Sequence, residues 1–90
     1  MSPAIDADAV LDATGAPDGL AHETLDVRDL GPPKPLARTL ERLTELDGET
    51  ALVQLNDRAP QHLYPELDDR GYAHETVEHG GATVTVVWEP

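Results

Sequence analysis

The sequence predicts an α+β fold, a two-layer β-α-β-α-β-β sandwich with two helices on one face of a four-stranded mixed sheet. Two segments carry leucines at helical spacing, and four short segments have the residue types of strands. Runs of Gly, Pro, Asn and Asp separate these segments. The chain has 90 residues and room for one such domain. We expect that domain over residues 21–90, after an acidic flexible tail over residues 1–20.

The first 20 residues are rich in Ala, Asp, Gly and Pro, and they include a run of turn formers from Thr14 to Gly19. Such a composition is typical of a disordered arm. A second interpretation stays open. Pro3 to Ala13 can form a short helix whose apolar content is Ile5, Val10 and Leu11, and this helix would dock on a partner or on the domain itself.

The first strand and helix of the domain follow this tail. Alternating apolar residues predict a strand over His22–Arg28. A helix is predicted over residues 33–46, because Pro33 suits a first helical turn, where the missing N–H costs nothing. Asp47-Gly48 then ends the helix. Its apolar stripe consists of Leu36, Leu40, Leu43 and Leu46.

The second strand is predicted over Thr50–Leu55. We expect Val53 and Leu55 to face the first helix, because side chains alternate along a strand. The opposite face of the sheet would then carry Leu52 and Gln54. That face would be half open, as is normal in small two-layer domains, and a partner would find room there.

The last three elements are a helix over Gln61–Arg70 and two strands over Ala73–His79 and Ala82–Glu89. Gly80-Gly81 between the strands predicts a tight hairpin turn. In the last strand one face carries Val84, Val86 and Trp88, and the other carries Thr83, Thr85 and Val87.

The charge is extreme for this length, since 18 acidic residues face 6 basic ones, a net charge of −12. Such a chain repels nucleic-acid phosphates and anionic lipid headgroups, so we expect no nucleic-acid and no membrane partner. Either the acids form a surface for a partner, or they adapt the protein to molar salt, which screens self-repulsion. Their spread along the whole chain favours a halophilic protein.

The chain contains no cysteine, which excludes disulfides, thiolate chemistry and iron–sulfur ligation by its own residues. The N-terminus lacks the basic residues and apolar run of a signal peptide. No stretch approaches the roughly 18 apolar residues of a membrane span. We therefore expect a cytoplasmic protein.

Residues 25–36 read Leu-Asp-Val-Arg-Asp-Leu-Gly-Pro-Pro-Lys-Pro-Leu. This run resembles the Leu-Asp-x-Arg-x-Leu and Cys-Pro-x-Pro signature of the TusA/SirA sulfur-carrier family, and Asp47 to Thr50 resembles that family's Pro-Gly-Glu-Thr. The resemblance covers about residues 22–89 and implies the same fold. Pro32 stands where the family carries its persulfide cysteine. A persulfide needs a thiolate, so the resemblance implies the fold and argues against the activity.

A closer resemblance is to a cysteine-free branch of that fold, the domain of unknown function 2249. Some of its members carry a His and a basic residue where this chain has Arg58 and Gln61, which weakens any His-based chemistry. Relatives are often fused to hemerythrin-like or other redox-associated domains, which implies a role near iron, nitrogen-oxide or sulfur metabolism. The positions that match the branch are Leu25 to Arg28, Pro32 to Leu36, Gly48 to Leu52, Asn56-Asp57, Pro60, Leu63-Tyr64 and Leu67.

Asp26 and Arg28 lie two residues apart on the first strand and so share one face. They are expected to form an ion pair that fixes the corner between strand and helix. The functional alternative is an anchor for a small anionic ligand at the start of the helix. Prolines remove several N–H donors there, which argues against an anion site.

Asp57, Arg58 and His62 follow the second strand, at the edge where α/β folds often place ligands. They would converge as a polar cluster. The alternative is a solvated loop in which Asn56 or Asp57 caps a turn through its side chain.

The four histidines have no zinc-ligand spacing, and we expect no metal site. His22 and His74 would meet only if their strands were neighbours. The single serine, Ser2, lies in the tail, and no nucleophile–base set is visible, so we expect neither an enzyme nor a cofactor.

The leading hypothesis is a non-catalytic adaptor that keeps the sulfur carrier's docking surface, without its thiol, and binds a protein partner there. Arg28, Lys34 and Arg58 are its candidate contact residues, beside Asp26 and the 57–62 loop. The alternative is a domain that binds a small molecule, haem or metal through that loop.

Overall fold

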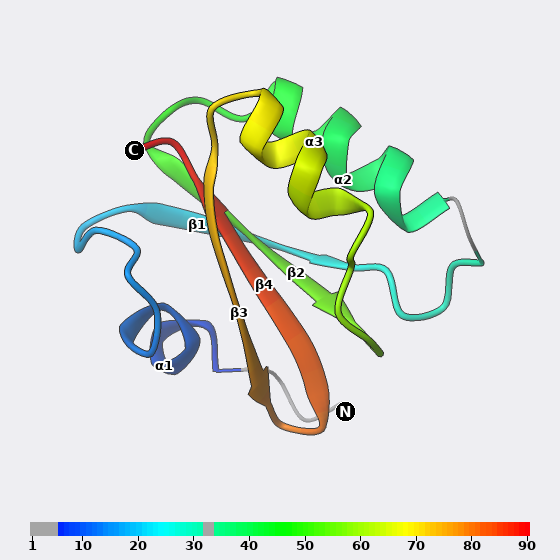
Figure 1. Cartoon of the computed structure of the whole chain (residues 1–90). Coiled ribbons are helices and arrows are strands. Elements are labelled where there is room, and N and C mark those ends of the chain that lie inside the picture. The colour runs from blue at the N-terminus through cyan, green and yellow to red at the C-terminus, as the bar shows by residue number, and fades with distance from the viewer. Residues whose placement is uncertain (1–5, 32–33) are drawn as a thin grey trace.

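The computed structural model describes residues 6–31 and 34–90 (Figure 1). The predicted order of strands and helices within the domain is confirmed, and the boundaries differ from the predicted ones by no more than two residues. Five residues named above lie outside the described residues: Ser2, Pro3, Ile5, Pro32 and Pro33. The elements are α1 (Ala7–Asp12), β1 (Ala21–Asp26), α2 (Lys34–Glu45), β2 (Thr50–Asn56), α3 (Leu63–Asp69), β3 (Ala73–His79) and β4 (Ala82–Trp88).

The four strands form one mixed sheet in the order β1-β2-β4-β3. β1 pairs with β2 in parallel, whereas β4 is antiparallel to both β2 and β3. The parallel pair needs a crossover, which α2 supplies, and the carboxyl ends of β1 and β2 therefore meet at the same end of the sheet. β1 and β3 are the two edge strands, so His22 and His74 lie at opposite edges and do not meet.

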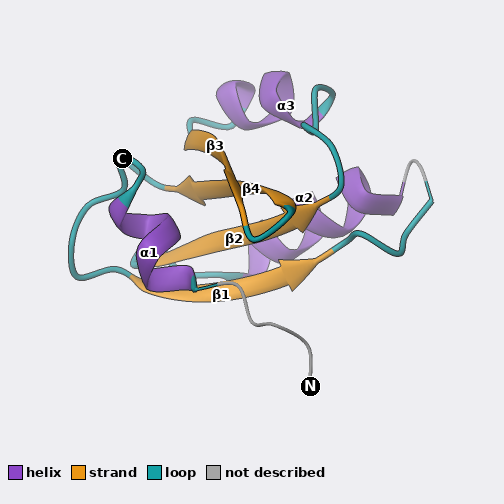
Figure 2. Ribbon diagram, turned by 90° about the horizontal axis from the view of Figure 1, so that it is seen from below, coloured by secondary structure: helices purple, strands orange, loops and turns teal. Residues whose placement is uncertain are grey.

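Helices cover both faces of the sheet. Figures 1 and 2 show α2 and α3 on one side and α1 on the other. The predicted sandwich is thus confirmed, with α1 as an additional helix on the second face. The core on the α2 and α3 side consists of Leu43, Leu52, Leu63, Leu67 and Val87. The core on the α1 side consists of Val10, Ala51, Val53, Leu55, Ala82, Val84, Val86 and Trp88.

The two faces of β2 are reversed relative to the prediction, which was wrong on this point. Leu52 and Gln54 point toward α2 and α3, whereas Val53 and Leu55 lie on the α1 side. The strand is buried from its second residue onward. A strand covered on both faces carries apolar residues in both rows, so alternation does not distinguish the faces.

Residues 6–20 pack against the sheet instead of extending as a flexible tail. Val10 is only 1% exposed, and partly buried apolar side chains of the same segment flank it. Asp6 caps α1, because its carboxylate accepts a hydrogen bond from the Ala9 N–H at 3.1 Å. The apolar row beneath α1 explains the difference from the predicted tail, since covering that row removes it from water. Residues 6–20 thus match the second interpretation, a short helix that docks on the domain itself.

A salt-bridge cluster ties α2 to the edge strand β1. The Arg42 guanidinium donates to the Glu23 carboxylate and also to Glu45, the latter at 2.7 Å. These bonds lower the pKa of Glu23 and raise the pKa of Arg42. The cluster therefore gives this corner a dependence on acid pH.

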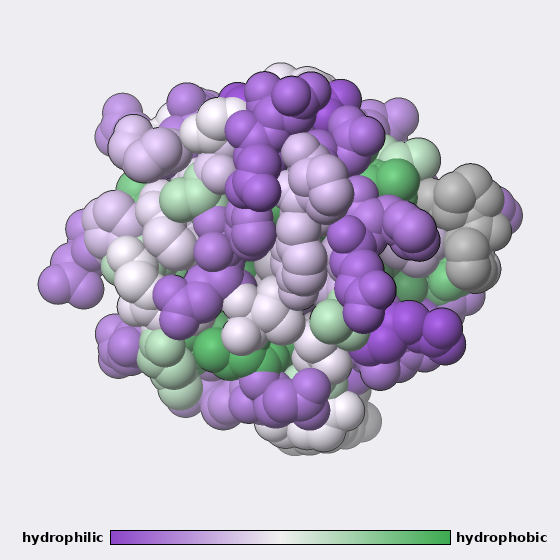
Figure 3. All heavy atoms as spheres, in the orientation of Figure 1, coloured by the Kyte–Doolittle hydropathy of each residue, from purple (hydrophilic) through white to green (hydrophobic). Residues whose placement is uncertain are grey.

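The surface agrees with the net charge of −12. The face shown in Figure 3 is largely hydrophilic, and its apolar patches are small and separate. No helix within the described residues is long and apolar enough to cross a membrane.

Candidate functional site

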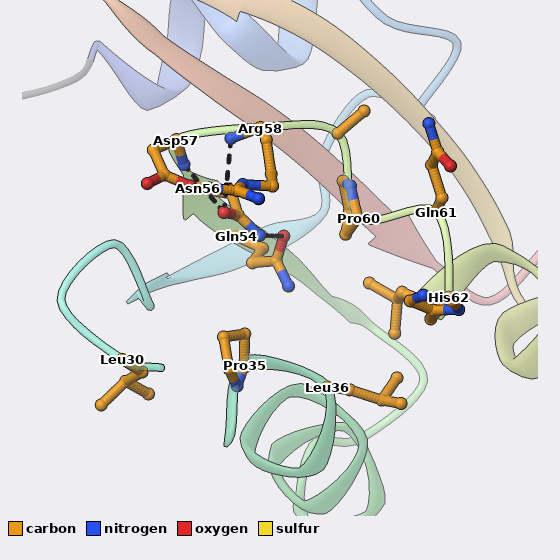
Figure 4. Close-up of a pocket in the computed structure, with 12 residues that line it drawn as sticks. Leu30, Pro35, Leu36, Gln54, Asn56, Asp57, Arg58, Pro60, Gln61 and His62 are labelled. Atoms are coloured by element: carbon orange, nitrogen blue, oxygen red, sulfur yellow. Dashed lines mark hydrogen bonds and ion pairs between the residues drawn. The ribbon is translucent and has the colours of Figure 1, made fainter. Parts of the chain in front are cut away.

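A hollow of about 770 Å³ opens at the carboxyl end of β2. One side is lined by Leu30, Pro35 and Leu36, from the loop before α2 and from its first turn. Figure 4 shows Pro60, Gln61 and His62 on the opposite side, with Gln54 and Asn56 between the two sides. The hollow thus lies where β2, the start of α2 and the loop before α3 meet.

The loop after β2 is ordered by the side chain of Asn56. Its Oδ1 accepts hydrogen bonds from the backbone N–H groups of Asp57 at 2.8 Å and Arg58 at 3.4 Å. This is the turn-capping geometry predicted for Asn56 or Asp57. Further along, the Leu63 N–H donates to the Pro60 carbonyl at 2.9 Å. These local bonds turn the chain from β2 into α3 and hold the wall of the hollow in place.

Gln54 and Asn56 form the floor of the hollow and belong to a buried hydrogen-bond chain that continues behind it to Thr39. The Thr39 hydroxyl donates to the Pro35 carbonyl at 2.7 Å and accepts from Gln54 Nε2 at 2.8 Å. The Gln54 Oε1 accepts from Asn56 Nδ2 at a longer distance of 3.5 Å. Thr39 and Gln54 are both 0% exposed. Among the described residues, every buried side-chain polar atom has a partner, so this floor fixes the shape of the site.

This buried chain was not predicted from the sequence. A glutamine inside an apolar strand and a threonine beside the leucine stripe of α2 were the available signals. Each is common on a surface, so their pairing becomes visible only when β2 is seen to face α2 with Gln54.

The three polar residues predicted to converge after β2 do line the hollow, but as its solvated rim. Arg58 is 81% exposed at its side chain, and its Nε lies 3.4 Å from the Asp57 carboxylate. His62 is exposed, and its side chain makes no capping bond to α3. The rim therefore offers one cation, one carboxylate and one imidazole to a binding partner.

The other candidates lie outside this lining. Arg28 and Asp26 form a two-pronged ion pair, with Nη2–Oδ2 at 2.7 Å and Nε–Oδ1 at 2.9 Å. The Arg28 hydrogen bonds lower the pKa of Asp26. This ion pair has the geometry expected of a structural contact at the end of β1. Lys34 is exposed at the start of α2 and does not line the hollow either.

A second polar cluster links α3 to β3. The rings of Tyr64 and His74 stack at 4.9 Å, and His74 Nε2 lies 3.0 Å from an Asp68 oxygen. The Tyr64 hydroxyl lies 2.6 Å from Thr76 Oγ1, which in turn lies 2.9 Å from Thr85 Oγ1. These contacts fix the helix on the sheet. Within residues 6–31 and 34–90, no three His, Cys, Asp or Glu side chains are grouped so that they could hold a metal ion.

A comparison with protein families matches residues 24–88 to a family described as an uncharacterized conserved protein, DUF2249. Comparisons with curated proteins and with solved structures give no match. The family match runs from β1 to the end of β4 and contains the whole hollow, whereas α1 precedes it. The resemblance to the domain of unknown function 2249 is therefore confirmed, and this chain belongs to the DUF2249 family.

Proposed function

We propose that this domain is a non-catalytic adaptor that binds a segment of a partner protein in the hollow at the end of β2. The observation that carries the proposal is the composition of its walls. Leu30, Pro35 and Leu36 line one side of the hollow, and Pro60 and Leu63 also belong to its lining. Apolar walls with a polar rim are typical of a site that takes the side chains of a partner. The rim then supplies orientation, because Arg58 is open to an acidic group of the partner.

The resemblance to the sulfur carriers supports the same location. In that fold the start of the first helix is the end that carries the thiol, and the hollow borders this start at Pro35 and Leu36. Position 32, where that resemblance places the absent thiol, precedes it by three residues. The domain would thus keep a carrier-like docking surface without the carrier chemistry. A link to redox, sulfur or nitrogen-oxide metabolism is part of this proposal.

The lining also favours binding over catalysis. Among the described residues the lining contains no serine, threonine, cysteine or lysine, and its one carboxylate and one imidazole, those of Asp57 and His62, lie on the exposed rim. Its polar floor is engaged in hydrogen bonds of its own. Rigid apolar walls with such a floor are suited to recognition.

A second candidate is a small organic ligand in the same hollow. Its volume of about 770 Å³ lies within the range of roughly 300–1,000 Å³ that is common for ligand sites. His62 is the only histidine among the described residues of the lining, so the hollow supports an organic ligand better than a haem or a metal ion.

Site-specific photo-crosslinking tests the adaptor. A benzophenone amino acid is placed at position 61 on the rim and, as a control, at position 41, an exposed site on the surface of α2. We expect one discrete protein adduct from position 61 in cells of the native host and none from position 41. The adduct should be lost in Arg58→Glu and kept in Arg38→Glu, which reverses the charge of an exposed arginine outside the lining.

Equal adducts from positions 61 and 41, or an adduct that survives Arg58→Glu, would contradict the adaptor proposal. Native mass spectrometry of the purified chain addresses the second candidate. A stoichiometric small molecule that is lost in His62→Ala would replace the protein partner by an organic ligand.

A further inference from the structure

The sheet face beneath α1 lies within the family match, whereas residues 6–20, which cover that face, lie outside the match. The family match begins at Thr24, after α1 and its linker to β1. The face itself consists of large apolar side chains of β2 and β4, namely Val53, Leu55, Val84, Val86 and Trp88. A domain limited to the family match would therefore leave a broad apolar face that needs a cover from another source.

The cover that this chain supplies is small. α1 has six residues, and Val10 is its one fully buried side chain. A helix this short is not stable by itself, so its helical form depends on its contact with the sheet. A second hollow of about 290 Å³ separates Leu11 from the returning chain at Ala16 and Leu20. The Gly15 N–H donates to the Glu75 carboxylate at 2.8 Å and ties the segment to β3.

The cover and the surroundings of the face beneath it are both acidic. Residues 6–20 contain four aspartates and no basic residue. Glu75 of β3 lies at the border of the same face, and the whole chain carries a net charge of −12. Like charges repel one another when salt does not screen them. A basic segment would be attracted to these acidic surroundings, whereas the cover carries charge of the same sign as they do.

We propose that the α1-covered face of the sheet is a docking site for a basic amphipathic helix of a partner protein, and that α1 is its displaceable cover. α1 shows that this face accepts a helix. A partner helix of three or four turns would place apolar residues at i, i+4 and i+7 over Val84, Val86 and Trp88, and so bury more surface than Val10 does. Its lysines or arginines would lie near Glu75. The site is on the face opposite the hollow, so it does not depend on the function proposed there.

Trp88 is the only tryptophan of the chain, is 9% exposed and lies in this face, so its fluorescence reports on the cover. The variant Val10→Asp of the full chain should expel α1. Ala9→Asp is the matched control, because it adds the same charge to an exposed position of the same helix. The probe is a synthetic 14-residue amphipathic helix of leucine, alanine and lysine. Its counterpart carries glutamate in place of lysine.

We expect Val10→Asp to bind the lysine peptide at least tenfold more tightly than the wild type or Ala9→Asp, with a change in Trp88 emission. The glutamate peptide should not bind. Binding that is no tighter in a folded Val10→Asp, or equal binding of both peptides, would overturn the proposal. Self-association of this variant would also overturn it, because a second copy of the chain would then be the occupant.

If Val10→Asp fails to fold, hydrogen exchange of the wild type tests whether α1 is displaceable. The Ala13 N–H, bonded to the Ala9 carbonyl at 3.1 Å, reports on α1. A displaceable cover predicts that this amide exchanges at least 100-fold faster than the amides of β4, and faster still at low KCl. Protection equal to that of β4 would make α1 an integral part of the fold and refute the proposal.

Discussion

Replacing Thr39 by valine removes one hydroxyl and keeps the shape of the side chain. In the wild type this hydroxyl donates to the Pro35 carbonyl and accepts from the Gln54 amide. Both Thr39 and Gln54 are fully buried, so water does not replace the lost partner. The variant Thr39→Val therefore leaves a buried amide N–H and a carbonyl without these bonds.

The expected loss of stability follows from these contacts. A buried polar group without a partner costs about 1–3 kcal/mol. The Pro35 carbonyl still accepts the helical N–H of residue 39, so only the Gln54 amide loses its partner, and the expected loss is about 1–3 kcal/mol. This is a large fraction of the roughly 5–15 kcal/mol that stabilises a typical domain.

Urea unfolding followed by circular dichroism measures the free energy of unfolding. Thr44→Val is the matched control, because the Thr44 hydroxyl also bonds a carbonyl of α2, that of Glu41, but at an exposed position. We expect the control to change stability by less than about 0.5 kcal/mol. The double variant Thr39→Val, Gln54→Leu should recover part of the loss, since it removes both partners. A loss in Thr39→Val no larger than in the control would refute the buried hydrogen-bond chain.

Three further outcomes are expected. Arg42 lowers the pKa of Glu23, so the pair stabilises the fold above the ordinary glutamate pKa of about 4.3 and loses that contribution as pH falls through the lowered pKa. Glu23→Gln should therefore flatten the loss of unfolding free energy below about pH 4.3, and an unchanged acid profile would count against the cluster. Leu67→Ala should cost about 2–5 kcal/mol in urea unfolding, because Leu67 of α3 is fully buried against the sheet, and a loss below about 1 kcal/mol would mean that α3 is not held by this contact. If the charge of −12 is an adaptation to salt, the melting temperature should rise steeply from about 0.1 M to molar KCl, whereas a flat response would redirect the acids toward a basic partner.

Elements with strong local signals could be predicted from the sequence. The β3–β4 hairpin is an example, because Gly80 and Gly81 both adopt positive φ, at 60° and 81°, as its tight turn requires. The residues on each face of β4 could also be assigned, since valines and threonines alternate along the strand. The end of β2 drew attention to Asp57, Arg58 and His62 because polar residues follow a buried strand there.

Other features depend on contacts between distant segments, which local patterns do not reveal. The orientation of β2 was predicted wrongly because the strand is buried on both faces, and alternation then placed Gln54, together with Leu52, on the open face. Its actual position depends on Thr39, which lies 15 residues away. The packing of α1 on the sheet was left open in the prediction for a related reason. Val10 becomes a core residue only because the sheet presents an apolar row to it.

The place of β4 bears on how the chain folds during its synthesis. β4 is the last strand in chain order, yet it lies between β2 and β3 in the sheet. Until Trp88 has left the ribosome, β3 has no strand beside it, and β2 has only β1. Translation at about 5–20 residues per second therefore leaves the half-built sheet with open edges for several seconds. Repulsion among the acidic residues, which all nascent copies carry, would keep neighbouring unfinished chains apart during that interval.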